Sequence, residues 1–233
     1  MRIYSEKFED SIYTSCPCFL IPFLEFIKAA IIYCDYRTIA KVFRIIISFN
    51  NNFFECMFEN ESNVQIQSLI CSIFNMRAEK SFCIVDKDKE IELTSIISLF
   101  NKSIELFEVI DFDLKGEIIR LTDQLLRYNI DSAYKIIVRY NSETFFEHFS
   151  YYVFNSNDIE ILNIYTECLI NLINYALPLD DCDKIYIIEN FDKELAEKFD
   201  DIMQSGEIDD EDTMHNISCL LEQVSVARES IED

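Results

Sequence analysis

The chain has 233 residues, of which 50% are hydrophobic, and its formal net charge is −23. This composition excludes a chain that is disordered throughout, and the excess of acidic residues disfavours binding to nucleic acids or to anionic membrane surfaces. With only two glycines and three prolines, the sequence lacks the turn residues of strand-rich folds and the glycine loops of nucleotide-binding folds. We therefore predict an all-α protein.

Residues 1–37 are predicted to form an N-terminal helical cap. The stretch Phe19–Tyr33 is the most hydrophobic of the chain, but it contains Glu25 and Lys28 and is shorter than a membrane span. Pro22 fits the first turn of a buried helix. The residues before this stretch lack the basic character of a signal peptide. Nine irregularly spaced cysteines agree with a reducing compartment, so we expect a cytoplasmic protein, with the nucleus as the alternative.

Three segments share one layout, in which two short helices precede a longer amphipathic helix. These segments are residues 38–78, 94–128 and 132–176. A fourth and more acidic unit is predicted over residues 183–227. The unit starts are 56, 38 and 51 residues apart, an irregular spacing that is centred near the roughly 40–47 residues of two- and three-helix repeats. The sequence thus predicts three to four helical repeats.

Two breaks interrupt the helical pattern. Residues 79–92, which contain the charged run DKDKE, are predicted to form an exposed loop. Pro178 is expected to end a helix just before an acidic segment begins. We therefore predict repeats over residues 38–179 and an acidic C-terminal helical unit over residues 180–233, which carries 18 acidic and 4 basic residues.

Helical periodicity is clearest in the long third helices of the first and third units. Apolar residues recur there at i, i+3, i+4 and i+7, over residues 63–76 and 157–176. Asn157 with Glu160 forms a capping pattern that predicts where the second of these helices begins. The residues expected to be buried at the interfaces between units are Ile70, Ile73, Leu169 and Leu172.

The ends of these two helices, ICSIFN and LINLIN, resemble the third helix of armadillo repeats in importin-α and β-catenin-like proteins. The resemblance implies a right-handed α-solenoid of three-helix units whose third helices line a concave groove. The terminal asparagine of the family pattern corresponds to Asn75 and Asn174, and the same position holds Arg127 and Gln223 in the other two units. The chain has no tryptophan, so it lacks the tryptophan–asparagine ladder of importin-α.

We therefore expect a non-enzymatic scaffold or adaptor that binds a basic or extended segment of a partner protein. Amide side chains can donate to and accept from an extended backbone, and acidic residues around a groove attract a basic segment. The alternative is a structural subunit that joins a larger stable assembly through an apolar interface. The candidate partner-binding residues are Asn75, Asn174, Gln67, Asn163, Asn171, Arg127 and Gln223.

One segment resembles the opening of a calcium-binding EF-hand loop. Acidic residues occupy positions 1 and 3 of Asp111–Ile118, and glycine occupies position 6. Lys115 at position 5 and Thr122 at position 12 break the pattern, because an EF-hand needs oxygen ligands at both. We expect a helix start with Asp113 as the N-cap instead.

No catalytic, cofactor or metal motif emerges from the remaining residues, and we predict neither an enzyme nor a cofactor. The two histidines, His148 and His215, fall in different units. The Cys16-Pro-Cys18 pair has no second pair with which to form a zinc site.

Overall fold

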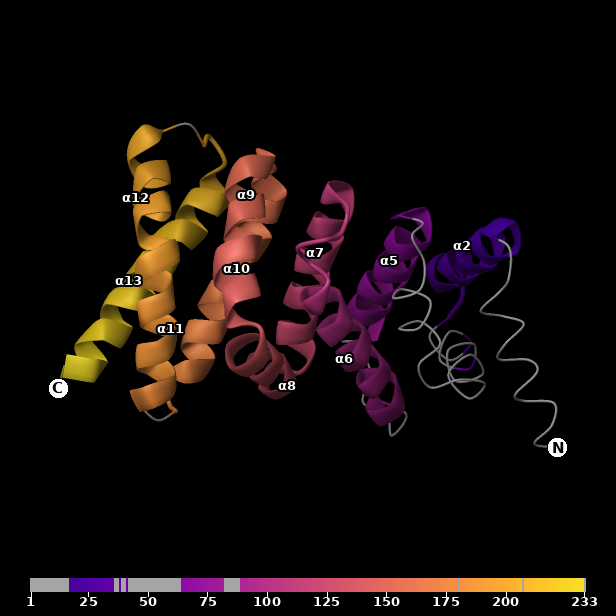
Figure 1. The fold of residues 1–233 in the computed structure, drawn as a ribbon, viewed down its shortest axis with the longest axis horizontal. Coiled ribbons are helices and arrows are strands. Elements are labelled where there is room, and N and C mark those ends of the chain that lie inside the picture. Colours follow the sequence, from indigo (N-terminus) through magenta and orange to yellow (C-terminus); the bar gives the residue numbers. More distant parts are fainter. Residues whose placement is uncertain are drawn as a thin grey trace. The chain divides into compact units, whose positions relative to one another are not determined.

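A computed structural model of the chain describes residues 17–35, 38, 41, 64–81, 89–179, 181–206 and 208–232. These residues form helices and short connections without any strand, which confirms the all-α prediction for the described part (Figure 1). The chain divides into two compact units. Unit 1 comprises residues 1–103 with 111–117, and unit 2 comprises residues 104–110 with 118–233.

In unit 1, helix α2 (Pro17–Tyr33) packs against helix α5 (Val64–Ser81) (Figure 1). Both helices bury an apolar stripe with the spacing of an amphipathic helix. The buried residues of α2 are Leu20, Leu24, Ile27 and Ile31, and those of α5 include Ile66, Leu69, Ile70, Ile73 and Phe74. No described helix is long and apolar enough to cross a membrane.

The predicted loop over residues 79–92 is wrong at both of its ends. Helix α5 continues to Ser81, and helix α6 (Lys89–Glu105) begins before the predicted loop ends. Residues 82–88 lie outside the described part of the chain. The predicted boundaries next to residues 37 and 180 also involve undescribed residues, so the three-part division remains a prediction.

The second predicted repeat contains two helices rather than three. Residues 94–110, predicted as two short helices, instead form the end of α6 followed by a turn. The predicted break falls at Ser103, whose buried hydroxyl donates a hydrogen bond of 2.8 Å to the backbone carbonyl of Phe100. A serine satisfied in this way can stay within a helix. One longer helix also avoids the cost of nucleating a second one.

Helix α7 (Phe112–Tyr128) includes most of the segment that resembles an EF-hand loop, so these residues do not form a calcium loop. The cap is Asp111 and not the predicted Asp113, since Asp111 Oδ1 accepts a hydrogen bond of 3.1 Å from the backbone N–H of Asp113. The residues of α7 up to Glu117 belong to unit 1, and those from Ile118 onward belong to unit 2.

The third predicted repeat has the expected layout. Its first two pieces are α8 (Ile130–Tyr134) followed by the π-helical segment η1 (Lys135–Tyr140), and the π-helical segment η2 (Thr144–Phe149) followed by α9 (Ser150–Ser156). Its third piece is α10 (Ile159–Ala176).

The N-cap of α10 is Asp158, one residue after the predicted Asn157. The Asp158 carboxylate accepts a hydrogen bond of 3.2 Å from the backbone N–H of Ile161. Asn157 instead ends α9 in the left-handed conformation, at a φ of 54°. Asparagine is one of the few residues besides glycine that adopts this conformation readily.

The fourth predicted repeat consists of α11 (Asp181–Glu194), α12 (Ala196–Ser205) and α13 (Glu211–Glu232). Gly206 ends α12 at a φ of 64°, where a side chain would be strained. Asp210 caps α13 by accepting a hydrogen bond of 2.8 Å from the backbone N–H of Thr213. Hydrogen bonds from the side chain and backbone of Thr213 lower the pKa of the Asp210 carboxyl.

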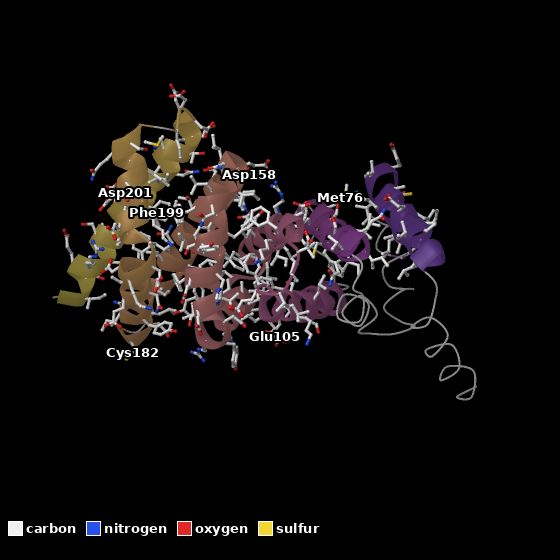
Figure 2. The ribbon with its side chains drawn as sticks, turned by 45° about the horizontal axis from the view of Figure 1, so that its top comes forward. Met76, Glu105, Asp158, Cys182, Phe199 and Asp201 are labelled. Carbon is white, nitrogen blue, oxygen red and sulfur yellow. The ribbon has the colours of Figure 1, made fainter. Side chains whose placement is uncertain are left out.

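Aromatic side chains form much of the core of unit 2. Phe145 lies 5.4 Å from Tyr165 between ring centroids, and the Tyr165 hydroxyl donates a hydrogen bond of 2.9 Å to the Phe145 carbonyl. Phe199 of α12 stacks on Phe191 at 6.0 Å, whereas Asp201 on the same helix is exposed (Figure 2). Burial is confirmed for the residues predicted at interfaces between repeats, whereas the interfaces themselves remain a prediction: Ile70, Ile73, Leu169 and Leu172.

Five cysteines whose side chains the structure describes are free thiols: Cys34, Cys71, Cys168, Cys182 and Cys219. Cys71 and Cys168 are fully buried, and this burial raises the pKa of each thiol. Neutral buried thiols behave as small hydrophobic side chains.

Candidate protein-binding surface

A row of polar side chains crosses the long helices α7, α10 and α13 of unit 2. Figure 1 shows α10 between the other two helices. We call this row the polar ladder and define it by its interacting members. They are Arg120, Asp123 and Arg127 of α7, Glu160, Asn163 and Glu167 of α10, and Asn216 of α13.

Two ion pairs join α7 to α10. Arg120 Nη1 lies 2.6 Å from Glu160 Oε1, and the Arg127 guanidinium pairs with the Glu167 carboxylate. Both pairs join residues that are 40 positions apart. The two arginines are seven residues apart on α7, and their glutamate partners are seven residues apart on α10 in the same order. Seven residues are about two helical turns, so α7 and α10 run in the same direction along this surface.

Amide hydrogen bonds continue the ladder from α10 to α13. Asn216 Nδ2 donates to Asn163 Oδ1 at 2.8 Å and lies 3.5 Å from Glu167 Oε1. Glu167 therefore takes part in contacts on both sides of α10. Its side chain is 31% exposed, which leaves part of the carboxylate open to solvent.

Asp123 is the buried member of the ladder. Its carboxylate accepts a hydrogen bond of 2.8 Å from Arg127 Nε. Burial raises the pKa of Asp123, and the hydrogen bond and positive charge of Arg127 counteract only part of this effect. Burial lowers the pKa of Arg127, but the contacts with Asp123 and the charge of Glu167 outweigh it, so the Arg127 pKa is raised. One guanidinium thus faces two carboxylates.

Two glutamine side chains on the helices of the ladder have buried carbonyl oxygens. Gln124 Oε1 on α7 and Gln223 Oε1 on α13 have no hydrogen-bond donor among the described residues. A buried carbonyl oxygen without a donor costs about 1–3 kcal/mol. Both side chains are partly exposed, although these oxygens themselves are buried.

The structure brings together only some of the residues predicted to bind a partner. Arg127 and Asn163 lie in the ladder, and Gln223 follows Asn216 by two turns on α13. On α10, Asn171 is half-buried and Asn174 is exposed. These residues all belong to unit 2.

The remaining predicted residues belong to unit 1, where Asn75 takes part in an internal contact. Asn75 is only 7% exposed. Its Nδ2 donates to Glu117 Oε2 at 2.9 Å and lies 3.3 Å from the Glu117 backbone oxygen. Gln67 of α5 is half-buried. The contact with Glu117 gives Asn75 a part in the packing of unit 1.

Sequence reasoning missed most of the ladder. Five of its members were not among the predicted residues: Arg120, Asp123, Glu160, Glu167 and Asn216. The sequence shows basic residues seven apart on α7 and acidic residues seven apart on α10, but it does not show that these residues face each other, because their offset of 40 differs from the predicted spacing of 38.

The two histidines have separate surroundings within unit 2. His148 Nε2 lies 3.0 Å from Glu108 Oε1, and His215 Nε2 lies 3.6 Å from Cys219 Sγ. In the described part of the chain, no group of three or more His, Cys, Asp or Glu side chains is placed to hold a metal ion.

No family model, curated protein or solved structure matches this chain.

Proposed function

We propose that this protein is a non-enzymatic protein-binding scaffold, in which armadillo-like units form an α-solenoid and the polar ladder holds a basic, extended segment of a partner. The observation that carries the proposal is the incomplete neutralisation of the ladder. Its three carboxylates, from Asp123, Glu160 and Glu167, face only two guanidinium groups, from Arg120 and Arg127.

Regular offsets between contacting residues support the repeated arrangement. Glu108 and His148 are 40 positions apart, which matches the offset of both ion pairs between α7 and α10. The next contacts along the chain have similar offsets, with Phe154 packing on Phe199 and Ser142 contacting Tyr186. Equivalent parts of successive units lie against each other in a helical repeat protein.

The exposed acids give a basic segment a place to bind at low cost. The Glu160 side chain is 69% exposed, so an incoming lysine or arginine can approach it without full desolvation. Single exposed ion pairs contribute only about 0–1 kcal/mol. Affinity would therefore also use hydrogen bonds between the partner backbone and amide side chains such as Asn171 and Asn174.

The acidic C-terminal part of the chain would accelerate association. Residues 180–233 carry 18 acidic and 4 basic residues, and α13 brings part of this charge next to the ladder. Charges at the edge of an interface mainly raise the association rate, and this effect weakens with salt.

Fluorescence anisotropy with labelled peptides tests the proposal. Peptides of equal length should be basic, neutral or acidic, and each should be titrated with the full chain at several salt concentrations. The basic peptide should bind, and the double variant E160Q/E167Q should weaken its binding about 3–10-fold at low salt. The matched control E197Q/D201N removes two exposed acids of α12 instead and should weaken binding less.

Two outcomes would contradict this function. One is equal binding of the three peptides, and the other is basic-peptide binding that ignores both salt and the ladder variant. Sedimentation of the same protein addresses the alternative function, since a structural subunit with an apolar interface would self-associate in a salt-insensitive way.

A further inference from the structure

His215 and Cys219 meet on the surface of α13. Cys219 Sγ lies 3.6 Å from His215 Nε2. The spacing of four residues places both side chains on the same face of the helix. His215 is exposed and Cys219 is partly exposed, so the two donor atoms can be reached from solvent. Neither residue belongs to the polar ladder.

The separation of these two atoms matches one edge of a tetrahedral metal site. Zinc binds cysteine sulfur at about 2.3 Å and histidine nitrogen at about 2.0–2.1 Å, and a tetrahedral angle between such bonds separates the two donors by about 3.6 Å. We propose that His215 and Cys219 bind a thiophilic divalent metal ion, such as Zn²⁺, through Nε2 and Sγ. The side chains already hold the required separation.

The chemistry of the pair selects this class of ion. Thiolate and imidazole are the ligands that zinc prefers, whereas calcium and magnesium prefer oxygen. The exposed carboxylates of Glu211 and Glu222 lie about one helical turn to either side of the pair. Their negative charge raises the local concentration of divalent cations.

The site is a chelate with two protein donors. No third His, Cys, Asp or Glu in the described chain is placed to complete it, so water fills the remaining positions. On binding, the Cys219 thiol releases its proton to solvent, and the ion exchanges two of its water ligands for sulfur and nitrogen.

Cys71, Cys168 and His148 have different surroundings. Cys71 and Cys168 are fully buried, and His148 pairs with the carboxylate of Glu108. Cys182, at the start of α11, is exposed (Figure 2). It therefore serves as the matched control for an accessible thiol.

Cobalt titration tests the proposal, since Co²⁺ replaces zinc in such sites and a cobalt–thiolate bond absorbs in the near ultraviolet. Adding Co²⁺ to the reduced full chain should produce this charge-transfer band, and Zn²⁺ should remove it. The variants C219S and H215A should each reduce the band at least several-fold, whereas C182S should leave it unchanged. Circular dichroism of each variant checks that the exposed substitutions preserve the helices.

Absence of the band in the wild-type protein would overturn the proposal. A band that persists at full strength in a folded C219S variant would also overturn it, because the thiolate would then come from another cysteine. An alkylation experiment gives an independent readout. Zn²⁺ should slow the modification of Cys219 but not that of Cys182, and equal rates with and without Zn²⁺ would contradict metal binding at this pair.

Discussion

Asn75 and Asn174 occupy the same position of the predicted repeat motif but have opposite surroundings. In unit 1, Asn75 is buried and donates to Glu117. In unit 2, Asn174 is exposed. The apolar residues that precede them are equally buried in both helices, since Ile73 and Leu172 are each 0% exposed. The motif thus specifies the apolar side of the helix, whereas the neighbouring helix decides whether the terminal asparagine is covered.

The largest expected effect is a loss of stability when a buried apolar residue of either helix is removed. Changing Ile73 or Leu172 to alanine should lower the free energy of unfolding by about 2–5 kcal/mol, because each substitution leaves a cavity in a packed interior. Urea denaturation followed by circular dichroism measures both values. A negligible loss at one site would show that the two helices are not equivalent in packing.

The second prediction separates the two asparagines. Asn75→Ala should destabilise the protein by about 1–3 kcal/mol, because the hydrogen bonds to Glu117 are lost in a buried setting. Asn174→Ala should change stability by less than about 0.5 kcal/mol, as expected at an exposed position. The same denaturation experiment provides the measurement. Equal losses would mean that burial does not distinguish the two positions.

The expected difference in stability determines which asparagine variant can be used to test partner binding. The sequence predicts that both asparagines bind a partner, and substitutions at exposed binding residues should leave the fold intact. The structure retains that expectation for Asn174 only. Weaker binding by Asn75→Ala is informative only after its stability has been measured.

The third and smallest prediction concerns Asp123, whose pKa is raised mainly by burial. A raised carboxyl pKa means that the folded protein binds the proton more tightly than the unfolded chain does. Wild-type stability relative to D123N should therefore increase as pH falls from above the folded-state pKa of Asp123 to its unfolded value of about 3.9. It should level off below that pH. Urea unfolding of both proteins across this range measures the difference, and an opposite slope would contradict the raised pKa.

The sequence predicts the helices of the third and fourth predicted repeats well, because amphipathic periodicity marks the long helices and Pro178 and Gly206 follow the ends of α10 and α12. Pro178 follows the end of α10 as expected, and α11 begins at Asp181. The second predicted repeat is predicted less well, since the end of α6 and a turn replace its first two predicted helices, and one continuous helix costs less to nucleate than two short ones. Caps are displaced by one or two residues, because neighbouring Asp and Asn side chains compete for the same role.

The ladder depends on information that the helical pattern does not carry. Periodicity places Glu160 and Glu167 on one stripe of α10, but it does not show which residues of α7 and α13 face them. The offset of 40 between the ion-paired residues differs from the predicted unit spacing of 38. Because a shift of two residues rotates a position by more than half a helical turn, the pairs emerge only from the three-dimensional packing.

The position of Glu167 between α7 and α13 has a thermodynamic consequence. Its carboxylate contacts Arg127 on one side and lies 3.5 Å from Asn216 on the other. Contacts that share one carboxylate are not independent, so removing Arg127 changes the energetic effect of removing Asn216. Reciprocity requires that the change be the same when the order is reversed. A cation that captured Glu167 would therefore alter the strength of both helix–helix contacts, and occupancy of this surface would be linked to the cohesion of α7, α10 and α13.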